Sequence, residues 1–133
     1  MRSDSCFGGA CDGIIEYMND DHIKFFHPNW MNRTLWPSLP TIDCLPLTDL
    51  LLQHNIVHVD FFSLDVEGAE MEVLRSLDLN KIKVDIFAIE NNKHEAEYVD
   101  HFSHFGFDLK ENRWPNSWFL RNHSKTRHYT YTA

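Results

Sequence analysis

The feature that most constrains the fold is an alternation, along the second two thirds of the chain, of short apolar runs with segments of helical spacing. The apolar runs at 57–64 and 84–90 are rich in β-branched and aromatic residues, which is typical of strands. The segments at 69–77 and 94–105 repeat apolar residues at helical intervals, which indicates amphipathic helices. Strands that alternate with such helices predict an α/β fold with a parallel sheet.

Further elements are expected at both ends of this unit. Residues 41–47 have the pattern of a short strand, and Thr48 is a candidate N-cap for a helix over 49–54. Residues 107–111 and 117–121 flank a turn that contains a proline, and they predict a closing antiparallel pair. The expected order of this region is therefore β-α-β-α-β-α-β-β.

The amino-terminal part of the chain has a different character. Residues 1–13 are small and polar, with a glycine-rich string at 7–13, and they predict a loop. Residues 14–26 have the pattern of a β-hairpin, and the three prolines within 27–40 argue against a long helix or a central strand there. We therefore divide the chain into a loop-rich segment, an α/β unit and a polar tail, at residues 1–40, 41–122 and 123–133.

Composition excludes several classes of function. The 133 residues have a formal net charge of −8, and their Lys and Arg residues are scattered. Nucleic acids and anionic membranes attract clustered basic residues, so we expect no nucleic-acid partner. No stretch approaches the roughly 18 to 20 apolar residues that a membrane span needs, so we expect no span in this chain. The three cysteines have no paired spacing and are expected to be free thiols.

Polar residues follow two of the expected strands at their carboxyl ends. Asp65 and Glu67 come directly after the strand over 57–64, and Glu90 and Asn91 end the strand that begins at 84. Ligands of parallel sheets bind beyond the carboxyl ends of the strands. If the two strands are neighbours, these side chains face the same crevice.

A purely structural reading of the same acids remains open. Asp65 would cap the helix that follows, and Glu67 would complement the dipole of that helix. Gly68 would provide a positive φ angle or a close approach between strand and helix. Other candidates also have structural readings: His101 and His104 would lie on a solvated helix face.

Two tryptophans, Trp114 and Trp118, lie near the closing pair of strands. Their large apolar rings are expected in the core rather than in a platform for substrate.

The acidic segment resembles a known family. The string Asp65-Val66-Glu67-Gly68-Ala69-Glu70 after a strand, the leucine-rich string at 47–51 and the strand that ends in Glu90 resemble the FkbM-type methyltransferase family of class I, S-adenosylmethionine-dependent O-methyltransferases. The resemblance covers about residues 41–122 and is closest to animal Star-like members. It implies a partial Rossmann-like class I methyltransferase sheet, mostly parallel with a closing antiparallel pair, in a three-layer αβα arrangement.

The resemblance also implies the chemistry of a site. S-adenosylmethionine would be the cofactor, and Asp65 and Glu67 would be catalytic. By analogy with catechol-type O-methyltransferases, Asp65, Glu90 and Asn91 would offer oxygen ligands to Mg²⁺, which would bind the acceptor hydroxyl and lower its pKa. The acceptor would be a hydroxyl-bearing small molecule or a glycan.

One departure from the family limits this reading. Members carry a glycine-rich cofactor turn after their first strand, and the string at 7–13 follows no apolar strand. We therefore expect the chain to be the carboxyl-terminal half of the domain, and to associate with itself or with a missing amino-terminal half. The alternative function is a non-catalytic Star-like domain for binding or for trafficking in the secretory pathway.

The cellular location is left open by these observations. An enzyme of this family would be cytoplasmic, whereas a Star-like protein would lie in the lumen of the Golgi or the endoplasmic reticulum. Asn32 and Asn122 begin N-x-S/T sequons, which are a faint sign of a lumen.

Overall fold

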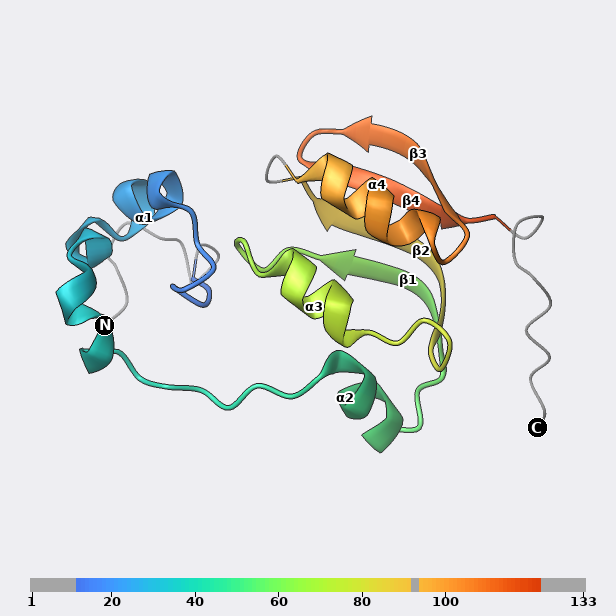
Figure 1. Cartoon of the computed structure of the whole chain (residues 1–133), viewed down its shortest axis with the longest axis horizontal. Helices are drawn as coiled ribbons and strands as arrows, with labels where there is room; N and C mark the ends of the chain where they lie inside the picture. The colour runs from blue at the N-terminus through green and yellow to red at the C-terminus, as the bar shows by residue number, and fades with distance from the viewer. Residues whose placement is uncertain (1–11, 92–93, 123–133) are drawn as a thin grey trace.

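A computed structural model describes residues 12–91 and 94–122 of the chain. Its central element is a four-stranded sheet with the strand order β1-β2-β4-β3 (Figure 1). The strands are β1 (His58–Leu64), β2 (Lys83–Glu90), β3 (Phe107–Arg113) and β4 (Asn116–Arg121). The helices of this unit are α2 (Leu47–Gln53), α3 (Glu70–Ser76) and α4 (Glu95–Ser103). The mixed α/β fold predicted from the alternating pattern is confirmed.

Pairing within the sheet confirms one prediction and corrects another. β1 pairs with β2 in parallel, with Phe61 opposite Ile86, so the two strands that end in acids are neighbours, which is the condition on which the shared position of those acids depended. β2 and β3 both pair antiparallel with β4, and the closing antiparallel pair is confirmed. Because β4 inserts beside β2, one of the three described pairings is parallel, and the description "mostly parallel" is wrong for these strands.

The core lies between the sheet and its helices. Phe102 of α4 is its centre, with ring centroids 4.8 Å from Phe87 of β2 and 4.6 Å from Phe119 of β4. Side chains of α2, α3 and α4 all pack against this cluster, and α3 and α4 lie in front of the sheet in Figure 1. The opposite face carries Phe61, which is 50% exposed and stacks on Trp118. The third layer of an αβα arrangement stays a prediction.

The segment before this unit contains a helix where a hairpin over 14–26 was expected. Helix α1 (Asp20–Phe26) begins at Asn19, whose side chain accepts a hydrogen bond of 2.8 Å from the backbone N–H of His22. Asp20 and Asp21 occupy its first turn, where acids favour a helix. The hairpin is wrong because this polar string caps a helix rather than turning between strands.

Two short 3₁₀ helices, η2 (Pro28–Met31) and η3 (Arg33–Ser38), follow α1. They agree with the expectation that the prolines of this region exclude a long helix or a central strand.

The strand expected over 41–47 is also wrong. Residues 41–46 have no regular structure and are exposed, and α2 begins directly after Pro46. A proline has no N–H to give to a strand ladder but fits the start of a helix.

Thr48 is not the N-cap of α2, because it lies inside the helix and is buried. Its hydroxyl donates to the Ser76 carbonyl oxygen at 2.9 Å and accepts from the Asp78 N–H at 2.7 Å. Thr48 therefore ties α2 to the end of α3.

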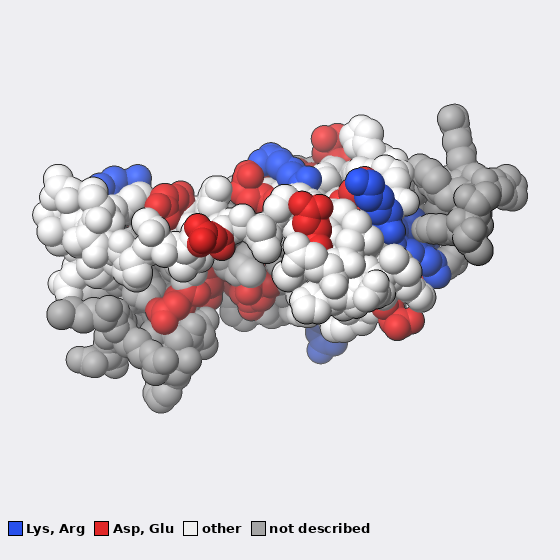
Figure 2. Space-filling view, turned by 90° about the horizontal axis from the view of Figure 1, so that it is seen from below, with Lys and Arg blue, Asp and Glu red and all other residues white. Residues whose placement is uncertain are grey.

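The surface agrees with the charge of the sequence. On the face drawn in Figure 2, Lys and Arg side chains alternate with Asp and Glu, and they form no continuous basic patch over the described residues. None of the described helices is long and apolar enough to cross a bilayer. Cys44 is an exposed free thiol. The predictions made for residues 1–11, including Cys6 and Cys11, and for the tail at 123–133 lie outside the described residues.

Candidate active site

The acidic string forms the loop between β1 and α3, and it has an unusual backbone. Glu67 and Gly68 both adopt positive φ angles, 55° and 107°. A Cβ atom on Gly68 would lie 2.3 Å from the carbonyl oxygen of Tyr17. The positive φ expected at Gly68 is confirmed. The close neighbour of the glycine is the segment before α1, so this part of the chain packs directly on the acidic loop.

Glu70 holds the loop from the inside. Its side chain is buried, and its Oε1 accepts hydrogen bonds from the N–H groups of Val66 at 3.0 Å and Gly68 at 3.1 Å. The N-cap position of α3 is Ala69, which makes no side-chain cap. The structural reading in which Asp65 caps this helix is therefore wrong, and the loop amides are satisfied by Glu70.

Three carboxylates meet where β1 and β2 end. Asp65, Glu70 and Glu90 each place one oxygen within 4.8 Å of the other two. Asp65 and Glu90 therefore lie close together, as expected if their two strands are neighbours. Within the described part of the chain, the exposed Asp65 side chain makes no hydrogen bond or ion pair. Carboxylate oxygens gathered at this separation are ligands of the kind that a hard divalent cation prefers.

Glu67 contacts α1. Its Oε2 lies 3.2 Å from Nδ1 of His22, and both side chains are largely buried. Burial raises the pKa of the Glu67 carboxyl above its ordinary value, and the nearby charge of His22 opposes that rise. The charges of Asp65 and Glu70 raise it further. Glu67 thus links the acidic loop to α1.

Asn91 is held by the start of α4 and by the β3–β4 hairpin. Its side-chain nitrogen lies 3.4 Å from Oε2 of Glu95 and 3.2 Å from Oδ1 of Asn112, and its backbone N–H donates to the Pro115 carbonyl at 2.7 Å. Glu70 supplies a third carboxylate oxygen beside Asp65 and Glu90. Sequence reasoning treated Glu70 only as part of a motif, although an acid in the first helical turn behind a glycine was a usable signal.

A second charged group lies at the opposite end of the same strands. His58 Nε2 is 2.9 Å from Oδ2 of Asp85 and 3.9 Å from Oδ1 of Asp60. Lys83 Nζ lies 3.2 Å from Asp85. Lys83 and His58 both contact Asp85, and the group is remote from the carboxyl ends of the strands.

The histidines of α4 differ from each other. His104 is exposed, as expected, but His101 is half-buried with its ring 5.4 Å from those of Phe102 and Phe105. Its Nε2 is buried without a hydrogen-bond partner among the described residues. Burial lowers the pKa of His101, and the charge of Arg75 lowers it further. The solvated face expected for His101 is wrong because its ring packs on two phenylalanines.

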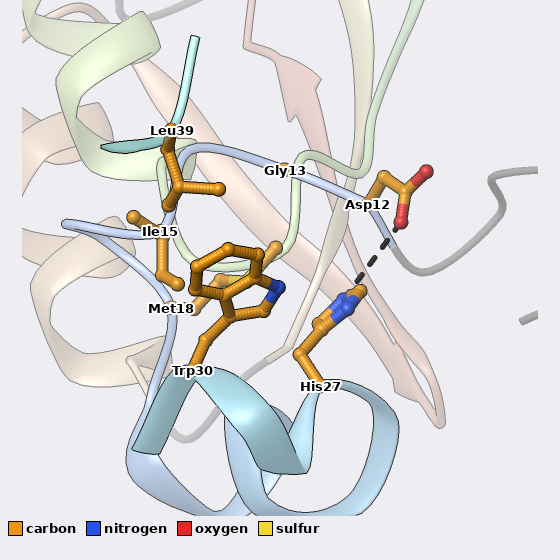
Figure 3. Close-up of a pocket in the computed structure, with 7 residues that line it drawn as sticks. All are labelled: Asp12, Gly13, Ile15, Met18, His27, Trp30 and Leu39. Atoms are coloured by element: carbon orange, nitrogen blue, oxygen red, sulfur yellow. Dashed lines mark ion pairs between the residues drawn. The ribbon is translucent and has the colours of Figure 1, made fainter. Parts of the chain in front are cut away.

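Two hollows flank α1. Figure 3 shows the smaller one, of about 130 Å³, where Met18, Trp30 and Leu39 surround an apolar space. The Asp12 and His27 side chains, 3.8 Å apart, close one side of it.

The larger hollow is a cleft of about 1480 Å³ between α1 and the start of α4. Trp114 borders it and is 86% exposed, so the expectation that Trp114 belongs to the core is wrong. Its position in the β3–β4 turn, beyond the helices, leaves the ring uncovered. Sequence reasoning missed both hollows because it did not find α1.

Comparison with known proteins identifies the family. A model of the methyltransferase FkbM domain matches residues 25–111, which run from α1 into β3 and include the acidic loop. No characterised protein and no solved structure matches the chain significantly. The matched region is well over half of the 133 residues. The chain therefore belongs to the FkbM methyltransferase family.

Proposed function

We propose that the chain carries the acceptor side of an S-adenosylmethionine-dependent O-methyltransferase, with Asp65 acting on the acceptor hydroxyl. Membership of the family supports methyl transfer. The observation that carries the assignment of residues is the meeting of Asp65, Glu70 and Glu90 at the carboxyl ends of neighbouring parallel strands. Ligands of such sheets bind at that edge.

The chemistry needs a group that deals with a proton. Methyl transfer forms a bond between the acceptor oxygen and the methyl carbon, breaks the bond from that carbon to the sulfonium, and releases the hydroxyl proton. Asp65 is exposed and lies beside two other carboxylates at the edge of the sheet where the acceptor is proposed to bind. Asp65 is the proposed general base, and Glu90 would orient the hydroxyl.

Glu67 and Glu70 would support this group indirectly. Glu70 fixes the loop through two backbone amides, and Glu67 binds His22. Glu67, expected from the resemblance to be catalytic, is proposed to position the loop against α1. Both residues would therefore act through the placement of Asp65.

A divalent cation is a further part of the proposal. Carboxylate oxygens are the ligands that Mg²⁺ prefers, and Asp65 and Glu90 lie close enough together to share one ion. Asn91 is the third ligand expected from the resemblance, and Glu70 offers a further carboxylate oxygen beside the pair. A bound cation would polarise the acceptor hydroxyl and lower its pKa.

A Star-like domain without catalysis is the second candidate function. The observation that favours it is that Glu67 and Glu70 already have structural partners, so these acids serve the folding of the loop without any reaction. Within residues 12–91 and 94–122, no strand leads into a glycine-rich turn. We accordingly propose that this chain binds S-adenosylmethionine weakly and that it corresponds to the carboxyl-terminal half of the domain.

Methyl transfer from labelled S-adenosylmethionine to a panel of alcohols, phenols and glycosides tests the proposal. Asp65→Asn should lower kcat by about 10²-fold or more and leave cofactor affinity unchanged, because a general base acts in the transition state. The matched control is Asp60→Asn, which removes an exposed acid from the other end of β1. Unchanged turnover in Asp65→Asn would refute the role of Asp65.

Two further arms separate the remaining alternatives. Loss of activity in EDTA with recovery in Mg²⁺ would support the cation, and full activity in EDTA would exclude it. Isothermal titration gives the affinity of the wild-type chain for S-adenosylmethionine. Tight cofactor binding would refute the weak binding proposed above, and a lack of methyl transfer to every acceptor would favour the non-catalytic Star-like domain.

A further inference from the structure

We propose that the cleft between α1 and the β3–β4 turn binds a neutral, polyhydroxylated ring, such as a sugar, and that this ring carries the acceptor hydroxyl. That the bound ring is the methyl acceptor rests on the proposed methyltransferase function, whereas binding of the ring does not. It is argued from the residues that line the cleft and from its connection to the acidic loop.

The cleft has two walls from distant parts of the chain. Asp21, His22 and Phe25 of α1 form one wall. The other wall combines the residues after β2 with the β3–β4 turn, and its polar and aromatic members are Asn91, His94, Glu95, Asn112 and Trp114. Its volume of about 1480 Å³ exceeds the roughly 300 to 1,000 Å³ of ordinary ligand pockets, which leaves room for more than one ring.

Both walls lie next to the acidic loop or to the end of β2. His22 lines the cleft and lies 3.2 Å from Glu67, in the loop that begins at Asp65. Asn91 lines the cleft and immediately follows Glu90. From these two links we infer that a molecule long enough to extend from the cleft toward the end of β2 would bring a hydroxyl to Asp65 and Glu90.

Exposed aromatic rings indicate what the cleft recognises. Phe25 is 75% exposed and Trp114 is 86% exposed, and they come from different walls. Exposed rings of this size bordering a polar cleft offer flat apolar surfaces at an energetic cost to the free protein. The C–H faces of a sugar ring are a partner with matching shape and polarity.

Hydrogen-bonding groups lie beside these rings. Glu95 accepts hydrogen bonds from the amide nitrogens of Asn91 and Asn112, which holds the three side chains in one network. Such a network presents amide and carboxylate groups in fixed directions, and hydroxyl groups can both donate to it and accept from it.

Charge excludes an anionic ligand and leaves little attraction for a cation. The described lining contains no Lys or Arg, which phosphate or sulfate groups require. Of its acids, Asp20 is paired with Arg33 at 2.7 Å and Glu95 belongs to the amide network. Asp21 is the remaining carboxylate, so a neutral ligand fits the cleft better than a charged one.

Ligand-observed NMR with methyl glycosides, without cofactor, tests the proposal. The probes are methyl glucoside, galactoside, mannoside and rhamnoside, with methyl glucuronide and glucosamine as the anionic and cationic comparisons. We expect neutral glycosides to bind with millimolar Kd, and Trp114→Ala and Phe25→Ala each to weaken binding by about three- to tenfold. Trp114→Phe should restore most of the affinity. The matched control, Ile42→Ala, removes an exposed apolar side chain outside the cleft and should change nothing.

Each contrary result overturns a defined part of the proposal. The proposal is refuted if no neutral glycoside binds, or if the glycosides bind Trp114→Ala and the wild type with equal affinity. Preferential binding of glucosamine that is lost in Asp21→Asn would identify a cation site instead. Methyl transfer to a non-sugar acceptor with no glycoside binding refutes the inference alone. Glycoside binding without methyl transfer counts against the proposed function and leaves the cleft assignment intact. Thermal melts confirm that each variant is folded.

Discussion

Replacement of Glu70 should unfold the acidic loop and cost a large part of the stability of the domain. The Glu70 side chain is 1% exposed, and its Oε1 accepts from the N–H groups of Val66 and Gly68. Glu70→Ala removes both bonds and leaves two half-buried amides to be satisfied by water. A hydrogen bond to a charged group contributes roughly 1.5 to 3 kcal/mol. Because solvent can reach the loop, we take the lower figure for each bond, which gives about 3 kcal/mol in total.

That loss is large against the ~5 to 15 kcal/mol that stabilises an ordinary domain. For a chain of this length it corresponds to a fall in Tm of roughly 10 °C. The matched control is Glu70→Gln, which keeps an uncharged acceptor oxygen in the same place and should cost only about 1 kcal/mol. Urea denaturation followed by circular dichroism measures all three proteins.

A second readout separates loop fixation from a general loss of packing. Hydrogen exchange of the Val66 and Gly68 amides should accelerate in Glu70→Ala more than exchange of the Phe87 amide in β2. If the free energy of unfolding of Glu70→Ala lies within about 1 kcal/mol of the wild-type value, or if these two amides remain protected from exchange, the Glu70 carboxylate does not hold the loop.

Three further predictions concern other parts of the fold. Gly68→Ala should destabilise the protein by about 2 kcal/mol, because it combines an unfavourable φ with a Cβ 2.3 Å from the Tyr17 carbonyl oxygen. In the control, Gly13→Ala, the Cβ would lie 3.0 Å from Met18 and 3.1 Å from the Glu67 Cβ without a positive φ, so urea denaturation should show a smaller loss, and equal losses would contradict the argument. Because the pKa of His101 is lowered in the folded protein, the unfolded chain takes up the His101 proton at a higher pH than the folded chain does. As the pH drops from 7 through the lowered pKa, the free energy of unfolding should therefore fall more in the wild type than in His101→Leu. Parallel dependence of the two proteins in urea denaturation at pH 7, 6 and 5 would refute this. Among the described strands, β1 pairs only with β2, and Phe61 of β1 is half-exposed. An unpaired strand edge tends to pair with another chain, so sedimentation should reveal concentration-dependent self-association, and Phe61→Lys should reduce it. A monomer at every concentration would contradict this prediction.

The sequence predicted the elements whose local pattern and final burial agree. The segment at 84–90 is almost continuously apolar, and β2 is the central strand with Phe87 and Ile89 fully buried. Tyr98 and Phe102 recur at helical spacing, and both are fully buried on the inner side of α4. The pairing of β1 with β2 followed from the α/β alternation, so the meeting of Asp65 with Glu90 could be predicted as well.

Features that depend on a few polar contacts were not predictable in this way. Helix α1 has seven residues and one buried side chain, Ile23, so its apolar pattern is too short to distinguish it from a hairpin. The position of Glu70 depends on a loop with two consecutive positive φ angles, one of them at a non-glycine residue. The exposure of Trp114 depends on where the β3–β4 turn lies relative to the helices. No local pattern contains that information.

The acidic loop is braced on two sides, and this has a consequence for its thermodynamics of binding. Glu70 holds its amides from within, while Tyr17 and His22 contact it from the segment around α1. A loop whose backbone is already fixed loses little conformational freedom when a ligand arrives, so more of the contact energy remains as affinity. Preorganisation of the Asp65 carboxylate therefore depends on residues some fifty positions earlier in the chain. Substitutions around Tyr17 should then make ligand binding entropically less favourable, with no change in any group that touches the ligand.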